Sequence, residues 1–159
     1  MMKKTLAVLA LVVAGGQVLA APADFAAYAV PVENITLKGP LTGANDQIRA
    51  KVAWVKTKGQ KPNFAGHYVL DSFGCGTGCM STVLVDLRTG AVYRAPFHEP
   101  TYGEKSYRAD SRLVEYSKYG YVKAGSPEMS QIDGVAIWDD KLKAFMIKSE
   151  GKPYKLEIE

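Results

Sequence analysis

The residues best suited to chemistry in this chain are its only two cysteines, which stand in the segment Gly74-Cys75-Gly76-Thr77-Gly78-Cys79. If residues 76–78 form a three-residue hairpin loop, Cys75 and Cys79 lie opposite each other on antiparallel strands. Opposite α-carbons are about 4.5–5.5 Å apart, a separation that a disulfide accepts. The segment therefore predicts a disulfide, which in so short a loop contributes only roughly 2 kcal/mol and mainly fixes the turn.

Three further chemistries remain open for the same segment. A thiol redox pair is one, although a three-residue spacer is unusual and no helix follows Cys75 to activate its thiol. A Cu(I) site is another, in which Met80 and either His67 or His98 would join the two thiolates. In an oxidising compartment, however, the disulfide closes before a metal arrives. The third is an anion-binding nest formed by the backbone N–H groups of the tip, residues 76–78.

Two histidines, His67 and His98, are the only side chains expected to titrate near neutral pH. This count excludes a three-histidine zinc site, and no His-Glu-x-x-His, Gly-x-Ser-x-Gly or P-loop pattern occurs. His98 stands in the proline-bounded segment 96–100, where it can form part of a binding rim. Both histidines are binding candidates, while no catalytic residue, metal ligand or cofactor is predicted. A non-enzymatic role is therefore favoured.

Tyrosines crowd the stretch between residues 93 and 121. Their broad apolar ring and polar tip suit recognition surfaces. Tyr93 and Tyr116 fall on predicted strands, where core packing explains them equally well. The tyrosines that fall on predicted loops are further binding candidates: Tyr102, Tyr119 and Tyr121.

The elements that must position these residues begin with an arm and a helix. Residues 21–43 contain three prolines and two short apolar pieces, and they predict an extended arm with one or two short strands laid on the domain. Then the period changes, because Ile48, Val52 and Val55 fall at helical spacing. Asn45 or Asp46 can cap the start of this helix, and Gly59 can end it.

The rest of the chain has the pattern of β-strands joined by turns. Strands are predicted over residues 66–73, 80–86, 91–94, 111–117, 135–138 and 144–148. The hairpin register pairs Val69 with Val85, Asp71 with Val83 and Phe73 with Ser81. Sequential strands with short turns predict an α+β, β-rich fold: an antiparallel meander sheet of about five to seven strands with one main helix packed on it. Residues 44–159 form this single domain.

The N-terminus has the order of features that a secretory signal peptide requires. Lys3 and Lys4 precede the apolar run 6–13, and small residues lead up to Ala20. Glycines and Gln17 interrupt the run before it reaches the roughly 20 apolar residues of a membrane anchor. We expect residues 1–20 to be removed, which leaves a product in the periplasm or the medium without stable membrane insertion.

The charge of the chain speaks against nucleic acid as a partner. The formal net charge of +4 includes two lysines of the leader, so the mature chain is only weakly basic. Nucleic-acid binders concentrate many cations on one face. The remaining length is ordinary for one domain and supports a real hydrophobic core.

The segment Asn63-Phe64-Ala65-Gly66-His67-Tyr68, followed by the cysteine segment 74–79 and then by Asp86, Thr89-Gly90 and Val92-Tyr93, carries a resemblance. With these motifs the chain resembles a group of small exported bacterial proteins of unassigned function, from about Tyr28 to the final hairpin. A tryptophan often precedes the Gly-Cys in that group, where Phe73 stands here. The resemblance implies export, this fold and this hairpin, and it implies no catalytic residue.

The sequence thus predicts an exported, disulfide-stapled domain that acts as a non-enzymatic periplasmic binding or inhibitor module for a protein or a small-molecule partner. A rigid tip suits this role, because the disulfide removes part of the ordering entropy that binding otherwise costs. The alternative is a thiol-redox or soft-metal protein that acts through Cys75 and Cys79. A count of free thiols separates the two predictions.

Overall fold

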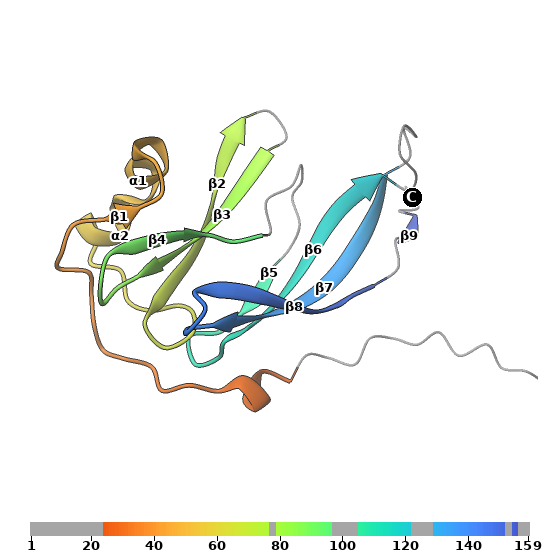
Figure 1. Ribbon diagram of the computed structural model, residues 1–159, viewed down its shortest axis with the longest axis horizontal. Helices are drawn as coiled ribbons and strands as arrows, with labels where there is room; N and C mark the ends of the chain where they lie inside the picture. Colours follow the sequence, from red (N-terminus) through yellow and green to blue (C-terminus); the bar gives the residue numbers. More distant parts are fainter. Residues whose placement is uncertain (1–23, 77–78, 97–104, 122–128, 152–153, 156–159) are drawn as a thin grey trace, which may run out of the picture.

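The computed structural model describes residues 24–76, 79–96, 105–121, 129–151 and 154–155, which form an α+β, β-rich fold of two sheets and a short helical region (Figure 1). The predicted leader and its cleavage site lie outside the described residues. So do four of the binding candidates: Thr77, Gly78, His98 and Tyr102.

The first sheet has four strands in the order β1-β4-β3-β2. They are β1 (Thr42–Gly43), β2 (Tyr68–Gly76), β3 (Cys79–Asp86) and β4 (Ala91–Arg94). As predicted, β2, β3 and β4 form an antiparallel meander, whereas β1 pairs with β4 in parallel. Three predicted pairs of the β2–β3 register are confirmed: Val69 with Val85, Asp71 with Val83 and Phe73 with Ser81.

The tip of the β2–β3 hairpin departs from the predicted register. An irregularity between Gly74 and Gly76 makes Gly76, and not Cys75, the partner of Cys79. Gly76 adopts a φ of 148°, which favours glycine and allows the bulge. Cys75 is disulfide-bonded, and no free cysteine occurs among the described residues. Because the side chain of Cys79 lies outside the description, the Cys75–Cys79 bond stays a prediction.

The second sheet follows the order β5-β6-β7-β8, and β9 also pairs with β7. Its strands are β5 (Lys105–Tyr107), β6 (Leu113–Tyr121), β7 (Met129–Asp139), β8 (Ala144–Glu150) and β9 (Tyr154–Lys155). All of these pairings are antiparallel. The prediction of one continuous meander was therefore wrong, because the chain leaves the first sheet after β4 and starts a second one at β5.

Two sheets form because β2 and β3 are apolar on both faces. Val69, Val83 and Val85 belong to one core cluster, whereas Leu70 and Leu84 belong to another. Strands buried on both faces read as continuous apolar runs, and each face must be covered. The alternation of the two clusters along β2 and β3 therefore requires a layer on either side of the first sheet.

The helical region covers one face of the first sheet. It consists of α1 (Asp46–Val52) and α2 (Trp54–Thr57), so the predicted single helix is two consecutive short helices. Asn45 caps α1 as predicted, because its Oδ1 accepts the N–H of Ile48 at 2.9 Å. The core between the helices, the arm and the sheet consists of Leu37, Ile48, Val52, Val55, Val69, Val83, Val85, Leu87 and Val92.

The second sheet covers the opposite face, so the molecule has three layers (Figure 1). The core between the sheets consists of Phe64, Ala65, Tyr68, Leu70, Leu84, Ala95, Val114, Tyr116, Ala136 and Trp138. Trp138 is its largest fully buried side chain. Full burial of one such side chain contributes about 1.5–3 kcal/mol, so this interface between the sheets is a major source of stability.

The N-terminal arm, residues 21–43 of the prediction, lies across both sheets and contains one short strand, β1, at its C-terminal end. It starts with η1 (Phe25–Tyr28), and only an isolated bridge joins Ala29 to Ser111. The N–H groups of Val30 and Glu33 donate to Asp110 and Gly66 at 2.8 and 2.9 Å. The arm is thus fastened to a turn of each sheet, the one before β2 and the one between β5 and β6.

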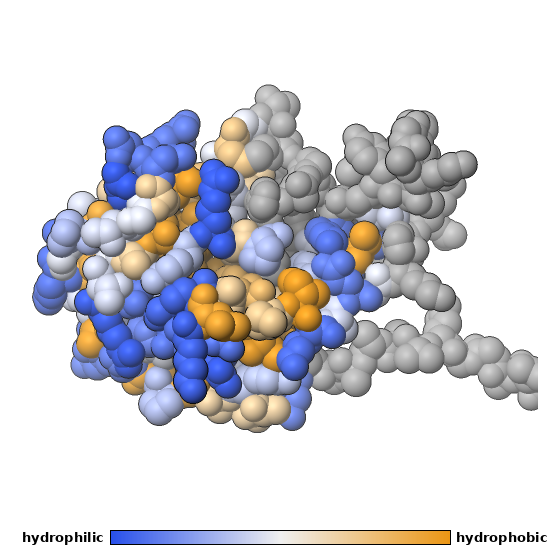
Figure 2. Space-filling model, viewed as in Figure 1, coloured by the Kyte–Doolittle hydropathy of each residue, from blue (hydrophilic) through white to orange (hydrophobic). Residues whose placement is uncertain are grey.

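Apolar side chains gather over β8, an edge strand of the second sheet (Figure 2). Met146 and Ile147 are both 46% exposed, and Leu142 in the preceding turn is 65% exposed. Lysines at both ends of this strip oppose edge-to-edge pairing with another chain. No helix in the described part of the chain is long and apolar enough to span a membrane.

Candidate functional site

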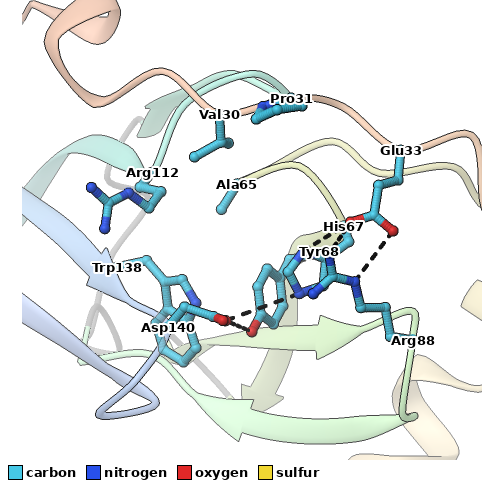
Figure 3. Close-up of a pocket in the computed structure, with 10 residues that line it drawn as sticks. All are labelled: Val30, Pro31, Glu33, Ala65, His67, Tyr68, Arg88, Arg112, Trp138 and Asp140. Carbon is cyan, nitrogen blue, oxygen red and sulfur yellow. Dashed lines mark hydrogen bonds and ion pairs between the residues drawn. The ribbon is translucent and has the colours of Figure 1, made fainter.

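A pocket of about 250 Å³ opens where the arm crosses from one sheet to the other (Figure 3). Residues from five separate stretches of sequence line it: Val30, Pro31, Glu33, Ala65, His67, Tyr68, Arg88, Arg112, Trp138 and Asp140. One predicted binding residue, His67, is among them. The arm supplies one wall, so the pocket exists only when the arm is in place.

The turn before β2 fixes the position of His67. Ala65 and Gly66 adopt φ values of 44° and 83°, which reverse the chain just before the histidine. The side chain of Asn63 then mimics a strand partner: it donates to the carbonyl of Leu70 at 3.0 Å and accepts the Leu70 N–H at 2.7 Å. Held in this way, the His67 side chain is only 9% exposed.

His67 lies among three carboxylates. Its Nδ1 is 3.7 Å from Glu33 Oε1, and its Nε2 is 3.9 Å from Asp86 Oδ1 and 4.0 Å from Asp140 Oδ1. Burial lowers the pKa of His67, and the nearby Arg88 lowers it further, against the opposing effect of the carboxylates. The imidazole is therefore neutral at neutral pH, and its Nε2 is free to accept or to donate one hydrogen bond.

Tyr68, Asp140 and Lys143 form a closed hydrogen-bonded group beside His67. The Tyr68 hydroxyl donates to Asp140 Oδ1, and Lys143 Nζ donates to both, at 2.9 Å to the hydroxyl and 3.0 Å to the carboxylate. Burial and the bond to Asp140 raise the pKa of Tyr68 to about 12. Burial disfavours the charge of Asp140, but the bonds from Tyr68 and Lys143 outweigh it and lower the pKa of Asp140 to about 2.

An ion pair closes the other end of the pocket. Arg88 Nε donates to Glu33 Oε2 at 3.2 Å, and a second guanidinium nitrogen contacts the other carboxylate oxygen. The backbone N–H of Arg88 donates to Asp86 Oδ1 at 2.8 Å, so the same turn holds two of the carboxylates that surround His67. Arg88 and Arg112 lie at opposite ends of the group of lining residues (Figure 3).

Three buried side-chain nitrogens in the described residues lack a hydrogen-bond partner, and all three line this pocket. They are His67 Nε2, Arg112 Nε and Trp138 Nε1. The indole N–H of Trp138 lies near the Tyr68–Asp140 pair, but its geometry does not complete a hydrogen bond. Buried polar atoms are normally paired, so this concentration of unpaired nitrogens marks a place that water or a ligand fills.

The structure separates His67 from the cysteine segment. His67 precedes β2 and Cys75 stands near its other end, so the rise per residue puts them about 26 Å apart. This separation excludes His67 from the soft-metal site that was left open as an alternative for the cysteine segment, while the other candidate, His98, lies outside the described residues. No group of three or more His, Cys, Asp or Glu side chains suited to a metal ion occurs in the described part of the chain.

The loop tyrosines have a different setting from the one predicted. β6 extends to Tyr121, so the backbone of both Tyr119 and Tyr121 lies in a strand and not in a loop. The predicted loop began after Ser117, because Lys118 and Gly120 interrupt the apolar pattern. Binding by the hairpin tip or by these tyrosines stays a prediction.

Sequence reasoning missed most of the pocket, including Glu33, Arg88, Arg112 and Asp140. They come from the arm, from two turns and from the residue just before β6, and no spacing along the chain links them. One signal was available: Trp138 precedes two aspartates in a predicted hairpin turn, and a buried tryptophan needs a partner for its N–H.

No protein-family model, no curated protein and no solved structure matches this chain. The function of the pocket therefore has to be inferred from its own geometry.

Proposed function

We propose that the mature chain is an exported, disulfide-stapled, non-enzymatic binding module, and that the pocket under the arm holds a small-molecule ligand. The observation that carries this proposal is that all three unpaired buried nitrogens of the described residues line one pocket. Leaving a buried polar group unsatisfied costs about 1–3 kcal/mol. Three such groups in one place are tolerable in the fold if an occupant completes their hydrogen bonds.

Binding explains the site better than catalysis does. The groups that could act as acid or base are already engaged with one another, since Tyr68, Asp140 and Lys143 are mutually hydrogen-bonded. With a pKa of about 12, Tyr68 is a poor base at neutral pH. His67 lies near three carboxylates, and its buried Nε2 makes no hydrogen bond to a hydroxyl or thiol of the described residues that it could activate.

Export and the staple are supported by separate features. The order of charged, apolar and small residues over positions 3–20 is that of a cleavable leader. Cys75 is disulfide-bonded, which suits an oxidising compartment such as the periplasm.

The test is to fill the pocket and to ask whether a bound ligand is lost. Val30→Trp places a large side chain in the wall that the arm contributes. Val32→Trp, at a neighbouring arm position that is 49% exposed and does not line the pocket, is the matched control. Each protein is isolated from the periplasm of its host and examined by native mass spectrometry.

We expect a small bound mass on the unchanged protein and on Val32→Trp, and none on Val30→Trp. Melting curves establish that both variants are folded. A bound mass that persists on Val30→Trp, or none on any of the three proteins, contradicts the proposal.

A further inference from the structure

The charges of the pocket point to the class of its ligand. Both lining carboxylates already have a cation as partner: Glu33 pairs with Arg88, and Asp140 pairs with Lys143. Arg112 has no carboxylate partner among the described residues, although its Nε is buried. The four charged residues of the lining, Glu33, Asp140, Arg88 and Arg112, sum to zero, and Arg112 is the one among them without an ion-pair partner in the described residues.

Asp86 does not cancel the charge of Arg112 at the site. It is not part of the pocket lining, and its side chain is only 3% exposed. It lies behind His67 and accepts the backbone N–H of Arg88. An occupant of the pocket therefore meets His67 and Arg112, while Asp86 is shielded by the imidazole.

The unpaired nitrogens require an acceptor. Arginine Nε and tryptophan Nε1 can only donate, so Arg112 and Trp138 both need an oxygen or another acceptor from the occupant. The two residues are neighbours, because the backbone N–H of Trp138 donates to the carbonyl of Arg112 at 2.9 Å. Trp138 lies on β7 and Arg112 just before the adjacent β6, and these two donors, one of them charged, suit the two oxygens of a carboxylate.

The remaining wall is apolar and the space is small. Val30, Pro31 and Ala65 contribute apolar side chains to the lining (Figure 3). A volume of about 250 Å³ corresponds to roughly eight water molecules in the liquid. This room suits an acid with a short hydrocarbon body and not a peptide or a nucleotide.

We infer that the pocket binds a small monocarboxylate, with its carboxylate at Arg112 and Trp138 and its apolar body against the arm. This inference rests on the proposed function, since it names the ligand class of the same pocket.

Three probes of similar size separate the charge classes: butyrate, butyramide and butylamine. Each is titrated into the mature protein, and the indole N–H resonance of Trp138 is followed by NMR, with Trp54→Phe used to assign it. We expect butyrate to bind roughly tenfold to a hundredfold more tightly than butyramide, because a hydrogen bond to a charged group is the stronger one. Butylamine should leave the resonance unchanged.

Arg112→Gln keeps a donor but removes the charge, and we expect it to abolish the preference for butyrate over butyramide. Arg108→Gln is the matched control, because Arg108 is paired with Asp110 and does not line the pocket. The comparison of the three probes on the unchanged protein does not depend on the folding of either variant.

Equal binding of butyrate and butyramide overturns the monocarboxylate class but leaves a small-ligand pocket. A Trp138 resonance that responds to none of the three probes also overturns the inference. Failure of the proposed function is seen separately by native mass spectrometry. In that case the unchanged protein carries no bound small molecule, or Val30→Trp still carries it.

Discussion

His67 is nearly buried, yet it faces three carboxylates at 3.7–4.0 Å. Such a setting would favour the imidazolium if the ring were solvated. Burial and Arg88 decide the balance in the opposite direction and lower the pKa of His67. The ring is thus kept neutral beside charged groups, which leaves an uncharged nitrogen at the inner end of the pocket.

The lowered pKa of His67 predicts how stability depends on pH. The unfolded chain takes up a proton at the ordinary value near 6.5, whereas the folded chain does not until the pH is lower. The free energy of unfolding contributed by this group is therefore complete above about pH 6.5 and declines as the pH falls below it. Asp140 does not titrate in this range, because its pKa is about 2.

Urea unfolding between about pH 5 and pH 8 measures this effect. The unchanged protein should lose stability toward pH 5, and His67→Gln, which does not titrate, should give a flatter profile. An unchanged slope in the variant would show that folding does not shift the pKa of His67, and a protein that becomes more stable on acidification would show that folding raises it.

At the scale of elements, the arm matters to the site as much as the sheets do, because it provides a wall of the pocket. It lies so close to the turns beneath it that a side chain does not fit at two glycines. A Cβ at Gly66 would come within 2.5 Å of the Pro31 carbonyl oxygen, and one at Gly90 within 2.0 Å of that of Pro40. Both glycines also have positive φ values. The backbone conformation and the close contact therefore both require a residue without a side chain at these two positions.

Gly66→Ala should therefore loosen the arm. Strain at a left-handed position costs on the order of 1–3 kcal/mol, and the close contact with Pro31 adds to it. Hydrogen exchange at the Val30 and Glu33 amides, which donate to Asp110 and Gly66, should become faster. Gly74→Ala is the matched control, since a Cβ there meets open space; equal exchange in both variants would contradict a tight arm.

The sequence predicted individual elements better than their assembly. The strands of the β2–β3–β4 meander and the cap at Asn45 follow from local patterns, and the structure confirms them. The division into two sheets does not follow from such patterns, because an apolar run such as residues 83–85 does not reveal what covers each face. β5 is only three residues long, so the segment that contains it was predicted to be a loop.

The same distinction explains what was missed at the site. His67 and the cysteines were found because their chemistry is visible from residue type alone. Arg112 and Trp138 acquire their role from a backbone contact between β7 and the residue just before β6, and Glu33 acquires its role from the path of the arm. Contacts of this kind are tertiary and have no signature in the local sequence.

At the scale of the whole molecule, the cysteine tip and the pocket occupy opposite ends of β2. Gly76 and the disulfide-bonded Cys75 lie at one end of β2, and His67 and Tyr68 lie at the other. Between them lie the buried positions of β2 and β3 that form part of both cores. The tip can therefore change without a direct effect on the pocket.

This separation gives a prediction for the double variant Cys75→Ser, Cys79→Ser. The closed loop is short, so the cost in unfolding free energy should be at most roughly 2 kcal/mol. The pocket should keep its ligand, because none of its lining residues comes from the tip. Urea unfolding measures the first expectation, and native mass spectrometry measures the second. The unchanged protein, isolated without reductant, should also show no free thiol by mass. Reactive thiols, or a bound ligand that is lost with the cysteines, would favour the thiol-redox or soft-metal alternative. In either case the functional site would be the cysteine tip.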